Sequence, residues 1–380
     1  MSCEKRPVRI ALIGAGKMAR AHSQAYLTAA RFFDLPVEPQ LSVLAGRSRE
    51  HAEQVARAFS WREVSCDWHE VVSRADVDLV DVCTPNALHA EMACAAAAHN
   101  KAVVCEKPLA TDLEGATLMA EAVRRAHVAN GVVFNYRYAP AVRHARNLIQ
   151  AGELGEVRHF SVHFLQDWLL DPARQMSWRL NSDEGGGVLL DLGAHLVDLV
   201  HHLVGPVSRV AGASAQFVAE RRDRGGVVRA VDVDDAVQAL LHTDSGALGT
   251  LEVSRVAAGY RTQNGFEIVG SRGSVRWEFQ RLNDLDVYLA DGPASLRGWR
   301  TVSVTEPGTH PWAGRWWGAG HVLGYEETFV HQLADFLQLR ILSDGQVSDS
   351  APPTFEDGLR CQRVLAAIAE ASRSGRWEAV

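Results

Sequence analysis

The chain has 380 residues, of which 47% are hydrophobic and 22% are charged, a composition typical of a folded globular protein. It carries 39 lysines and arginines against 46 aspartates and glutamates, a formal charge of −7. Proteins that bind nucleic acids or anionic membrane surfaces normally carry an excess of basic residues, so the composition disfavours both classes of protein. The length corresponds to about two domains.

The first third of the chain alternates short apolar runs, which predict strands, with helical stretches of roughly 10–15 residues. Strands are expected at 8–13, 41–45, 78–83, 102–105 and 132–134. Helices are expected after the first strand to about residue 30, and at 49–59, 87–99 and 112–127. This alternation predicts a parallel, doubly wound sheet, in which ligands bind at the carboxyl ends of the strands.

A glycine turn, GAGKMA at residues 14–19, follows the first strand and opens the first helix. Glycines let the backbone approach a pyrophosphate, and a helix N-terminus offers N–H groups and the positive end of its dipole. The third position of this fingerprint needs only a small residue, which Ala19 supplies. An ordinary strand–helix turn is the alternative, but the position after the first strand favours a dinucleotide site. We expect cofactor contacts from Gly14, Gly16, Lys17 and Met18.

The second predicted strand ends without a carboxylate and is followed by Gly46, Arg47, Ser48 and Arg49. In dinucleotide-binding folds an acid at this position binds the ribose 2′-hydroxyl of NAD, whereas an arginine accommodates the 2′-phosphate of NADP. Alternatively, Arg47 only stacks on the adenine while NAD binds. We therefore expect NAD or NADP, with a slight preference for NADP, and contacts from Arg47 and Ser48.

Polar side chains follow three of the apolar strands, at 84–86, 106–108 and 135–137. The carboxyl ends of parallel strands lie at one edge of the sheet, where the ligand binds. A lysine beside a cofactor, such as Lys107, can become a proton donor or acceptor when it loses contact with water. A solvated surface lysine is the alternative.

Three glycines at 185–187 lead into an apolar helix that carries Asp191 and His195. At a spacing of four residues the two side chains lie on one helix face, and Asp198 and His202 continue that stripe. A carboxylate and an imidazole one turn apart can hold a substrate hydroxyl and accept its proton. The alternatives are a capped helix with a hydrogen-bonded histidine, and a zinc site. We expect no metal, because the further ligands that zinc requires do not accompany the pair.

From about residue 156 the pattern changes to alternating strands, first at 157–164. Further strand-like runs lie near 207–217, 236–242, 249–256, 265–269, 274–279 and 285–289, and a closing helix is expected at 355–371. Trp312, Trp316 and Trp317 lie in a segment rich in glycine and proline, shortly after Trp299. These rings can wall a sugar site, or they can pack within a loop or at a subunit interface.

The six cysteines show no CxxC pair and no regular spacing, which favours reduced thiols in a reducing cytoplasm. We find no signal-peptide pattern, and no apolar run approaches the ~18 residues of a membrane-spanning helix. The expected location is therefore cytoplasmic, away from membranes.

Five segments together resemble the Gfo/Idh/MocA family of oxidoreductases. They are the glycine turn, CTPNALH at 83–89, CEKPLA at 105–110, FNYRY at 134–138 and GGGVLLDLGAHLVDL at 185–199. Within the family, residues 165–179 and 318–325 resemble the branch of levoglucosan dehydrogenase and related sugar and inositol dehydrogenases. The resemblance implies an α/β Rossmann domain over 1–134 and an α+β domain with a large, mostly antiparallel sheet over 135–380. It also implies a homodimer or homotetramer that forms through one face of that sheet.

The resemblance further implies a catalytic set of Lys107, Asp191 and His195, in which either Lys107 or His195 takes the hydroxyl proton. Expected cofactor contacts in addition to those above are Thr84, Pro85, Asn86, His89, Glu106, Lys107 and Arg179. Expected substrate contacts are Lys107, Tyr136, Arg137, Gln166, Asp167, Trp178, Arg179, Asp191, His195 and His321.

The expected reaction is the NAD(P)-dependent oxidation of a secondary hydroxyl of a cyclic polyol or sugar to the ketone, or the reverse reduction. No dense lysine and arginine cluster marks a phosphate pocket on the substrate side, so a neutral substrate is expected. Two alternatives are a regulator that senses NAD(P) without catalysis and a glycosidase that uses NAD transiently.

Overall fold

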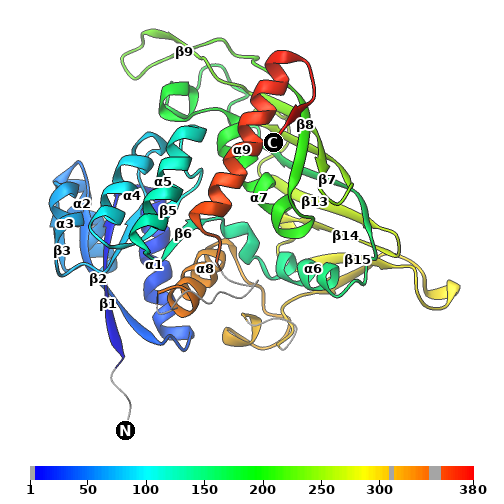
Figure 1. Ribbon diagram of the computed structural model, residues 1–380, viewed down its shortest axis with the longest axis horizontal. Coiled ribbons are helices and arrows are strands. Elements are labelled where there is room, and N and C mark those ends of the chain that lie inside the picture. The colour runs from blue at the N-terminus through cyan, green and yellow to red at the C-terminus, as the bar shows by residue number, and fades with distance from the viewer. Residues whose placement is uncertain (1–4, 308–311, 342–351) are drawn as a thin grey trace. The chain divides into compact units, whose positions relative to one another are not determined.

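The computed structural model describes residues 5–307, 312–341 and 352–380 (Figure 1). Contacts divide the chain into two compact units. The first unit is Met1–Tyr138 with Tyr325–Leu359, and the second is Ala139–Gly324 with Arg360–Val380. The described residues 325–341 and 352–359, which the expected boundary placed in the second domain, thus pack with the first unit.

The first unit contains a six-stranded parallel sheet in the order β3-β2-β1-β4-β5-β6, which is the strand order of a Rossmann fold. The strands are β1 Arg6–Ile13, β2 Val37–Ala45, β3 Glu63–Ser65, β4 Leu79–Val82, β5 Ala102–Glu106 and β6 Asn130–Val133. Strands β4 and β5 are buried along their whole length, which explains their near-continuous apolar sequence. The predicted doubly wound sheet is confirmed.

The helices of this unit are α1 Lys17–Phe32, α2 Arg49–Phe59, α3 Trp68–Ser73, α4 His89–Ala98, α5 Leu113–Ala126 and α8 Tyr325–Leu339. Three begin at side-chain caps: Ser48 accepts a backbone N–H of α2, Asp67 of α3 and Asp112 of α5. Helix α8 packs against α1, although the two are separated by almost the whole chain (Figure 1). Neither α8 nor the short elements β3 and α3 were expected from the sequence.

The second unit contains a nine-stranded sheet in the order β16-β15-β14-β13-β7-β12-β11-β8-β17. Its strands are β7 Val157–Leu165, β8 Val207–Ala215, β11 Ala236–Thr243, β12 Leu248–Ser254, β13 Gln263–Gly270, β14 Gly273–Glu278, β15 Asp284–Leu289, β16 Arg300–Ser303 and β17 Glu378–Ala379. Only the β7–β12 pair of this sheet is parallel. The predicted large, mostly antiparallel sheet is confirmed. Strands β9 Glu220–Arg222 and β10 Val228–Ala230 form a separate hairpin.

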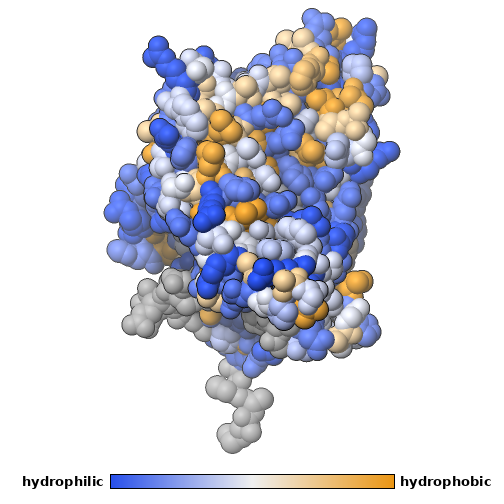
Figure 2. Space-filling model, turned by 90° about the vertical axis from the view of Figure 1, so that its right-hand side faces the viewer, coloured by the Kyte–Doolittle hydropathy of each residue, from blue (hydrophilic) through white to orange (hydrophobic). Residues whose placement is uncertain are grey.

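One face of the nine-stranded sheet is buried and the other is open within the chain. Along β7, Phe160, Val162 and Phe164 are buried, whereas Ser161 and His163 between them are partly exposed. The buried face packs against α6 Pro140–Gln150, α7 Ala194–Leu203 and the part of α9 Phe355–Ser374 that belongs to this unit. Figure 2 views the side on which β13–β15 lie in Figure 1, and hydrophobic patches interrupt its hydrophilic surface.

Within the described ranges, the apolar stretches of the helices are all too short or too polar to cross a bilayer. The described cysteines are free thiols, and Cys3 lies outside the described residues.

Candidate active site

The glycine turn joins the end of β1 to α1 and lies against the end of β4. Gly14 has a φ of 122°, and a Cβ there would lie 2.4 Å from the carbonyl oxygen of Cys83. A Cβ on Gly16 would meet nothing within 4 Å, and among the described residues no side chain caps the first N–H groups of α1. Open space before an uncapped helix N-terminus suits an anion such as a pyrophosphate.

The tip of β4 carries a buried hydroxyl without a partner. Thr84 Oγ1 makes no hydrogen bond with any residue that the structure describes, and a bound ligand can satisfy such a group. His89 is fully buried, with Nδ1 2.9 Å from the carbonyl oxygen of Pro108 and Nε2 3.1 Å from that of Thr84. Burial lowers the pKa of His89, and the neutral ring can donate a hydrogen bond to only one of these two carbonyl oxygens.

Two expected cofactor residues, Arg47 and Ser48, follow the end of β2 and have different surroundings. Arg47 is exposed and follows Gly46 in a loop with no carboxylate. Ser48 caps α2, with its Oγ 3.4 Å from the backbone nitrogen of His51. The His51 ring in turn lies 2.8 Å from the carbonyl oxygen of Ala15, so α2 is tied to the glycine turn.

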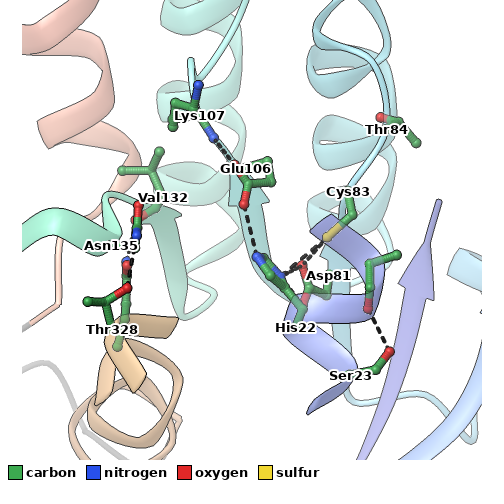
Figure 3. A network of polar contacts seen from close by, with 12 residues as sticks. His22, Ser23, Asp81, Cys83, Thr84, Glu106, Lys107, Val132, Asn135 and Thr328 are labelled. Atoms are coloured by element: carbon green, nitrogen blue, oxygen red, sulfur yellow. Dashed lines mark hydrogen bonds and ion pairs between the residues drawn. The ribbon is translucent and has the colours of Figure 1, made fainter. Parts of the chain in front are cut away.

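The tip of β5 is held by a buried polar network (Figure 3). Glu106 is 6% exposed; its Oε2 accepts the backbone N–H of Lys107 at 3.1 Å, and its Oε1 lies 3.0 Å from Nε2 of His22. The side chain of Lys107 is half-buried, and the Lys107–Pro108 peptide bond is cis. Glu106, expected at the cofactor, is thus also bound within its own unit.

Helix α8 and the first turn of α9 hold the tip of β6. Asn135 Nδ2 donates to Thr328 Oγ1 at 2.9 Å, and the rings of Tyr136 and Tyr325 are 5.9 Å apart. Burial raises the pKa of Tyr325 to about 12, so its phenol stays protonated near neutral pH. Arg137 Nη2 lies 3.8 Å from Asp357 Oδ1.

In the second unit the three glycines bring a loop and a carboxylate against the start of the Asp191 helix. A Cβ on Gly186 would lie 2.6 Å from the carbonyl oxygen of Arg179. Gly187 has a φ of 97°, and its Cβ would lie 2.4 Å from Asp234 Oδ1. Asp234 accepts the backbone N–H groups of Val188 and Leu189 at 2.8 and 3.2 Å and so caps the helix start.

Asp191 and His195 do not lie on one regular α-helix as the sequence predicted. Leu189–Gly193 forms a π-helical turn, and α7 begins after it at Ala194. The wider turn changes the angle between residues four apart, and such turns are frequent at functional sites. Asp191 and His195 are 5% and 7% exposed, so both are almost completely buried.

Two arginines hold the Asp191 carboxylate. Arg179 Nε lies 3.3 Å from Asp191 Oδ2, and Arg255 Nη2 contacts the same oxygen. The Arg255 side chain is 3% exposed, and its Nε and Nη1 find no hydrogen-bond partner within the described ranges. Asp191 is therefore fixed as a hydrogen-bond acceptor in this unit.

Each of the two guanidinium groups lies over an aromatic ring. Arg179 lies 4.2 Å from the ring centre of Trp178, and Arg255 lies 5.3 Å from that of Trp168. Trp168 Nε1 donates to Gln166 Oε1 at 2.9 Å, which ties one expected substrate residue to this group. The Phe164 and His195 rings are 6.1 Å apart, so the histidine lies above the buried face of β7.

The remaining expected substrate residues make contacts with other parts of the second unit. Asp167 Oδ2 lies 3.8 Å from Arg261 Nε, and His321 is exposed, with Nδ1 2.8 Å from the carbonyl oxygen of Gly318. Trp312 is buried beneath the guanidinium of Arg143, whereas Trp299 lies 4.5 Å from that of Arg276. Residues 308–311 of the tryptophan-rich segment lie outside the described residues.

His22, Arg255 and Tyr325 were not among the residues expected from the sequence. A signal existed for two of them, because a charged residue in an apolar strand requires a partner when it is buried. Asp81 interrupts the apolar strand β4 and contacts His22, and Arg255 directly follows β12 and contacts Asp191. Tyr325 begins a helix that the sequence analysis did not predict.

Comparisons with known proteins agree with this arrangement. A family model described as "Oxidoreductase family, NAD-binding Rossmann fold" matches residues 8–134, and the GFO/IDH/MocA C-terminal domain matches residues 142–276. The chain is 36% identical to levoglucosan dehydrogenase of Pseudarthrobacter phenanthrenivorans over 97% of each chain. It is 29% identical to scyllo-inositol 2-dehydrogenase (NAD(+)) of Bacillus subtilis over 70% of this chain and 73% of the relative. A solved structure of levoglucosan dehydrogenase in complex with NADH matches 99% of each chain at 35% identity, with a TM-score of 0.94.

Proposed function

The chain belongs to the Gfo/Idh/MocA family of oxidoreductases, and we propose that it oxidises a secondary hydroxyl of a neutral cyclic sugar or polyol, or reduces the corresponding ketone. One observation carries this proposal. A Rossmann unit with an open, uncapped helix N-terminus is combined in one chain with a buried carboxylate–imidazole pair. Neither of the two alternative functions, an NAD(P)-sensing regulator and an NAD-assisted glycosidase, has comparable support from these residues or from the relatives named above.

The residues of the first unit fit a nicotinamide dinucleotide. In the proposal, Gly14, Gly16 and the first N–H groups of α1 hold the pyrophosphate, and the orphaned Thr84 hydroxyl lies at the tip of β4, where a ligand binds. When bound, the cofactor supplies the acceptor or donor of the hydride. Relatives support NAD, whereas the exposed Arg47 and the missing acid at the end of β2 favour acceptance of NADP.

The chain's own residues would handle the proton and the charge of the substrate hydroxyl. We assign to Lys107 the stabilisation of the negative charge that develops on the carbinol oxygen, through a charge-assisted hydrogen bond. His195, or Lys107 itself, takes the hydroxyl proton. Asp191, already fixed by Arg179 and Arg255, is assigned to orient either the substrate hydroxyl or the Lys107 ammonium group, by accepting a hydrogen bond from it.

The aromatic rings near Asp191 suit the C–H faces of a neutral sugar or polyol. Arg179 and Arg255 both contact Asp191, so part of their positive charge is already neutralised within the chain. Trp168 and Trp178 add apolar ring surface beside the guanidinium groups, and rings of this kind pack on the C–H faces of sugars.

We further propose a cytoplasmic homodimer or homotetramer that forms through the open face of the nine-stranded sheet. Leu240 of β11 and Leu248 of β12 are each 45% exposed on that face. A sheet of this size with apolar side chains on its open face is a typical site of subunit contact.

The test is a steady-state assay of the purified chain with NAD and NADP, in which absorbance reports the reduced nicotinamide. The panel contains levoglucosan, inositols, hexoses and their keto forms. We expect turnover of at least one compound, and a loss of at least about 100-fold in Lys107→Ala and in His195→Ala with cofactor binding retained. Lys5→Ala, which removes an exposed lysine paired with Asp34, is the matched control. An absence of turnover across the whole panel would refute the proposal.

A further inference from the structure

A completely buried histidine connects two neighbouring strands of the Rossmann sheet. His22 of α1 has 0% exposure. Its Nδ1 lies 2.9 and 3.1 Å from the two carboxylate oxygens of Asp81 in β4, and its Nε2 lies 3.0 Å from Glu106 Oε1 in β5 (Figure 3). The same Glu106 carboxylate accepts the backbone N–H of Lys107. The contacts therefore run without a break from α1 to the residue that carries the proposed catalytic amine.

The protonation of the group follows from its donors and acceptors. An imidazole donates from both nitrogens only when it is protonated, and both nitrogens here face carboxylates. The other titratable neighbours, Tyr26 and Cys83, both contact Asp81, and burial raises the pKa of each, so they stay neutral donors. The group thus pairs one imidazolium with two carboxylates.

Hydrogen bonds account for this cluster without a metal ion. Ligand atoms of His22, Asp81 and Cys83 do lie within 4.8 Å of one another. However, the contacts of His22 with Asp81 are at hydrogen-bond distance, and the second ring nitrogen is used by Glu106.

We propose that His22 is a positioning residue, an imidazolium that fixes the Glu106 carboxylate and thereby the backbone of Lys107. The inference rests on the proposed function, because it concerns the amine of the same reaction. Helix α1 then has two roles. Its N-terminus is open to the cofactor, and its second turn holds the strand tip that bears Lys107.

The kinetic test compares His22→Gln, Glu106→Gln and the double variant. The single amide nitrogen of the His22→Gln side chain cannot reach both carboxylates, so the tip of β5 loses its anchor. We expect kcat to fall about 10- to 100-fold in His22→Gln, while the KM for the cofactor changes less than about threefold. In the double variant a neutral amide pair replaces the ion pair, and we expect kcat to recover at least tenfold relative to His22→Gln. His69→Gln, an exposed histidine of the same unit, is the control.

A second measurement does not need turnover and separates this inference from the proposed function. Reductive methylation with ¹³C labels the lysines, and the Lys107 resonance is assigned by its absence in Lys107→Arg. We expect this resonance to shift in His22→Gln and to return toward its wild-type position in the double variant. A folded His22→Gln protein with unchanged kcat, or with an unmoved Lys107 resonance, would overturn the inference. A wild-type protein without turnover whose resonance still responds to residue 22 would instead reject the function and retain the positioning role.

Discussion

Arg255 is the buried partner of Asp191, and its loss should affect both the fold and the activity. Its side chain is 3% exposed, against 40% for that of Arg179, which contacts the same oxygen. Arg255→Met would leave the buried carboxylate with one partly exposed partner. We expect the free energy of unfolding to fall by about 3 kcal/mol and kcat to fall at least about tenfold. Denaturant titrations and steady-state kinetics measure the two effects.

A matched control separates this site from the general effect of removing an ion pair. Arg229 lies 3.0 Å from Asp223 but is 59% exposed. Arg229→Met should change the free energy of unfolding by less than about 1 kcal/mol, because water screens exposed pairs. Equal losses in the two variants, or an Arg255→Met enzyme with full activity and stability, would contradict the role assigned to Arg255.

From the sequence alone, candidate site residues could be proposed where they belong to local motifs, but not where distant contacts define them. Lys107 and the Asp191–His195 pair stand in short, ordered motifs, so spacing pointed to them. His22 meets Asp81 and Glu106 across 59 and 84 residues, and Arg255 meets Asp191 across 64. A buried charge signals that a partner exists, but only the fold shows which residue it is.

The ion network of His22 ties α1 to β4 and β5, so it should make the stability of these elements depend on pH. Burial alone would lower the pKa of His22, but the charge and hydrogen bonds of Asp81 raise it well above the ordinary value of 6.5. The folded state therefore binds this proton more tightly than the unfolded chain does. The resulting stabilisation is complete below about pH 6.5 and is lost as the pH rises through the raised pKa.

His22→Gln lacks this proton, so its stability should differ most from the wild type in acid. We expect the gap in the free energy of unfolding to be widest near about pH 6 and to narrow toward about pH 9. The groups that face His22 are Asp81 and Cys83 at β4, Glu106 of β5, and the uncharged ring of Phe329 from α8. Urea titrations across this pH range provide the measurement. A gap that stays constant or widens with rising pH would show that His22 is neutral in the folded protein.

Most strands and helices of the Rossmann half were predictable because short apolar runs alternate regularly with helical stretches. The π-helical turn at Leu189–Gly193 was not, because the apolar spacing around Asp191 and His195 also suits an α-helix. Helix α8 was not predicted, for a different physical reason. It is buried on most sides, so its sequence lacks the single apolar stripe that marks a surface helix.

At the scale of the whole chain, the parallel sheet followed from the alternation of strands and helices, and the antiparallel sheet followed from the family resemblance. The assignment of residues 325–341 and 352–359 to the first unit did not follow from either. Local patterns show where an element lies along the chain but not which sheet it packs on. The segment returns to the first unit through contacts such as Gln332 Nε2 to the carbonyl oxygen of Val132 at 2.7 Å and Thr328 with Asn135. The first unit is therefore completed by residues that lie far from it in sequence.

The open sheet face should determine whether the chain exists as an oligomer. A lysine at position 240 points away from the buried face of β11, so Leu240→Lys should fold normally as a monomer. In an interface the same ammonium group would be buried without a partner, and we expect association to weaken at least about tenfold. Light scattering after size-exclusion chromatography, over a range of concentrations, gives the molar mass. Leu118→Lys, at a leucine of α5 that is 49% exposed, should leave the mass unchanged. A wild-type protein with the mass of one chain at every concentration, or a Leu240→Lys variant that associates as tightly as the wild type, would show that this face is not the interface.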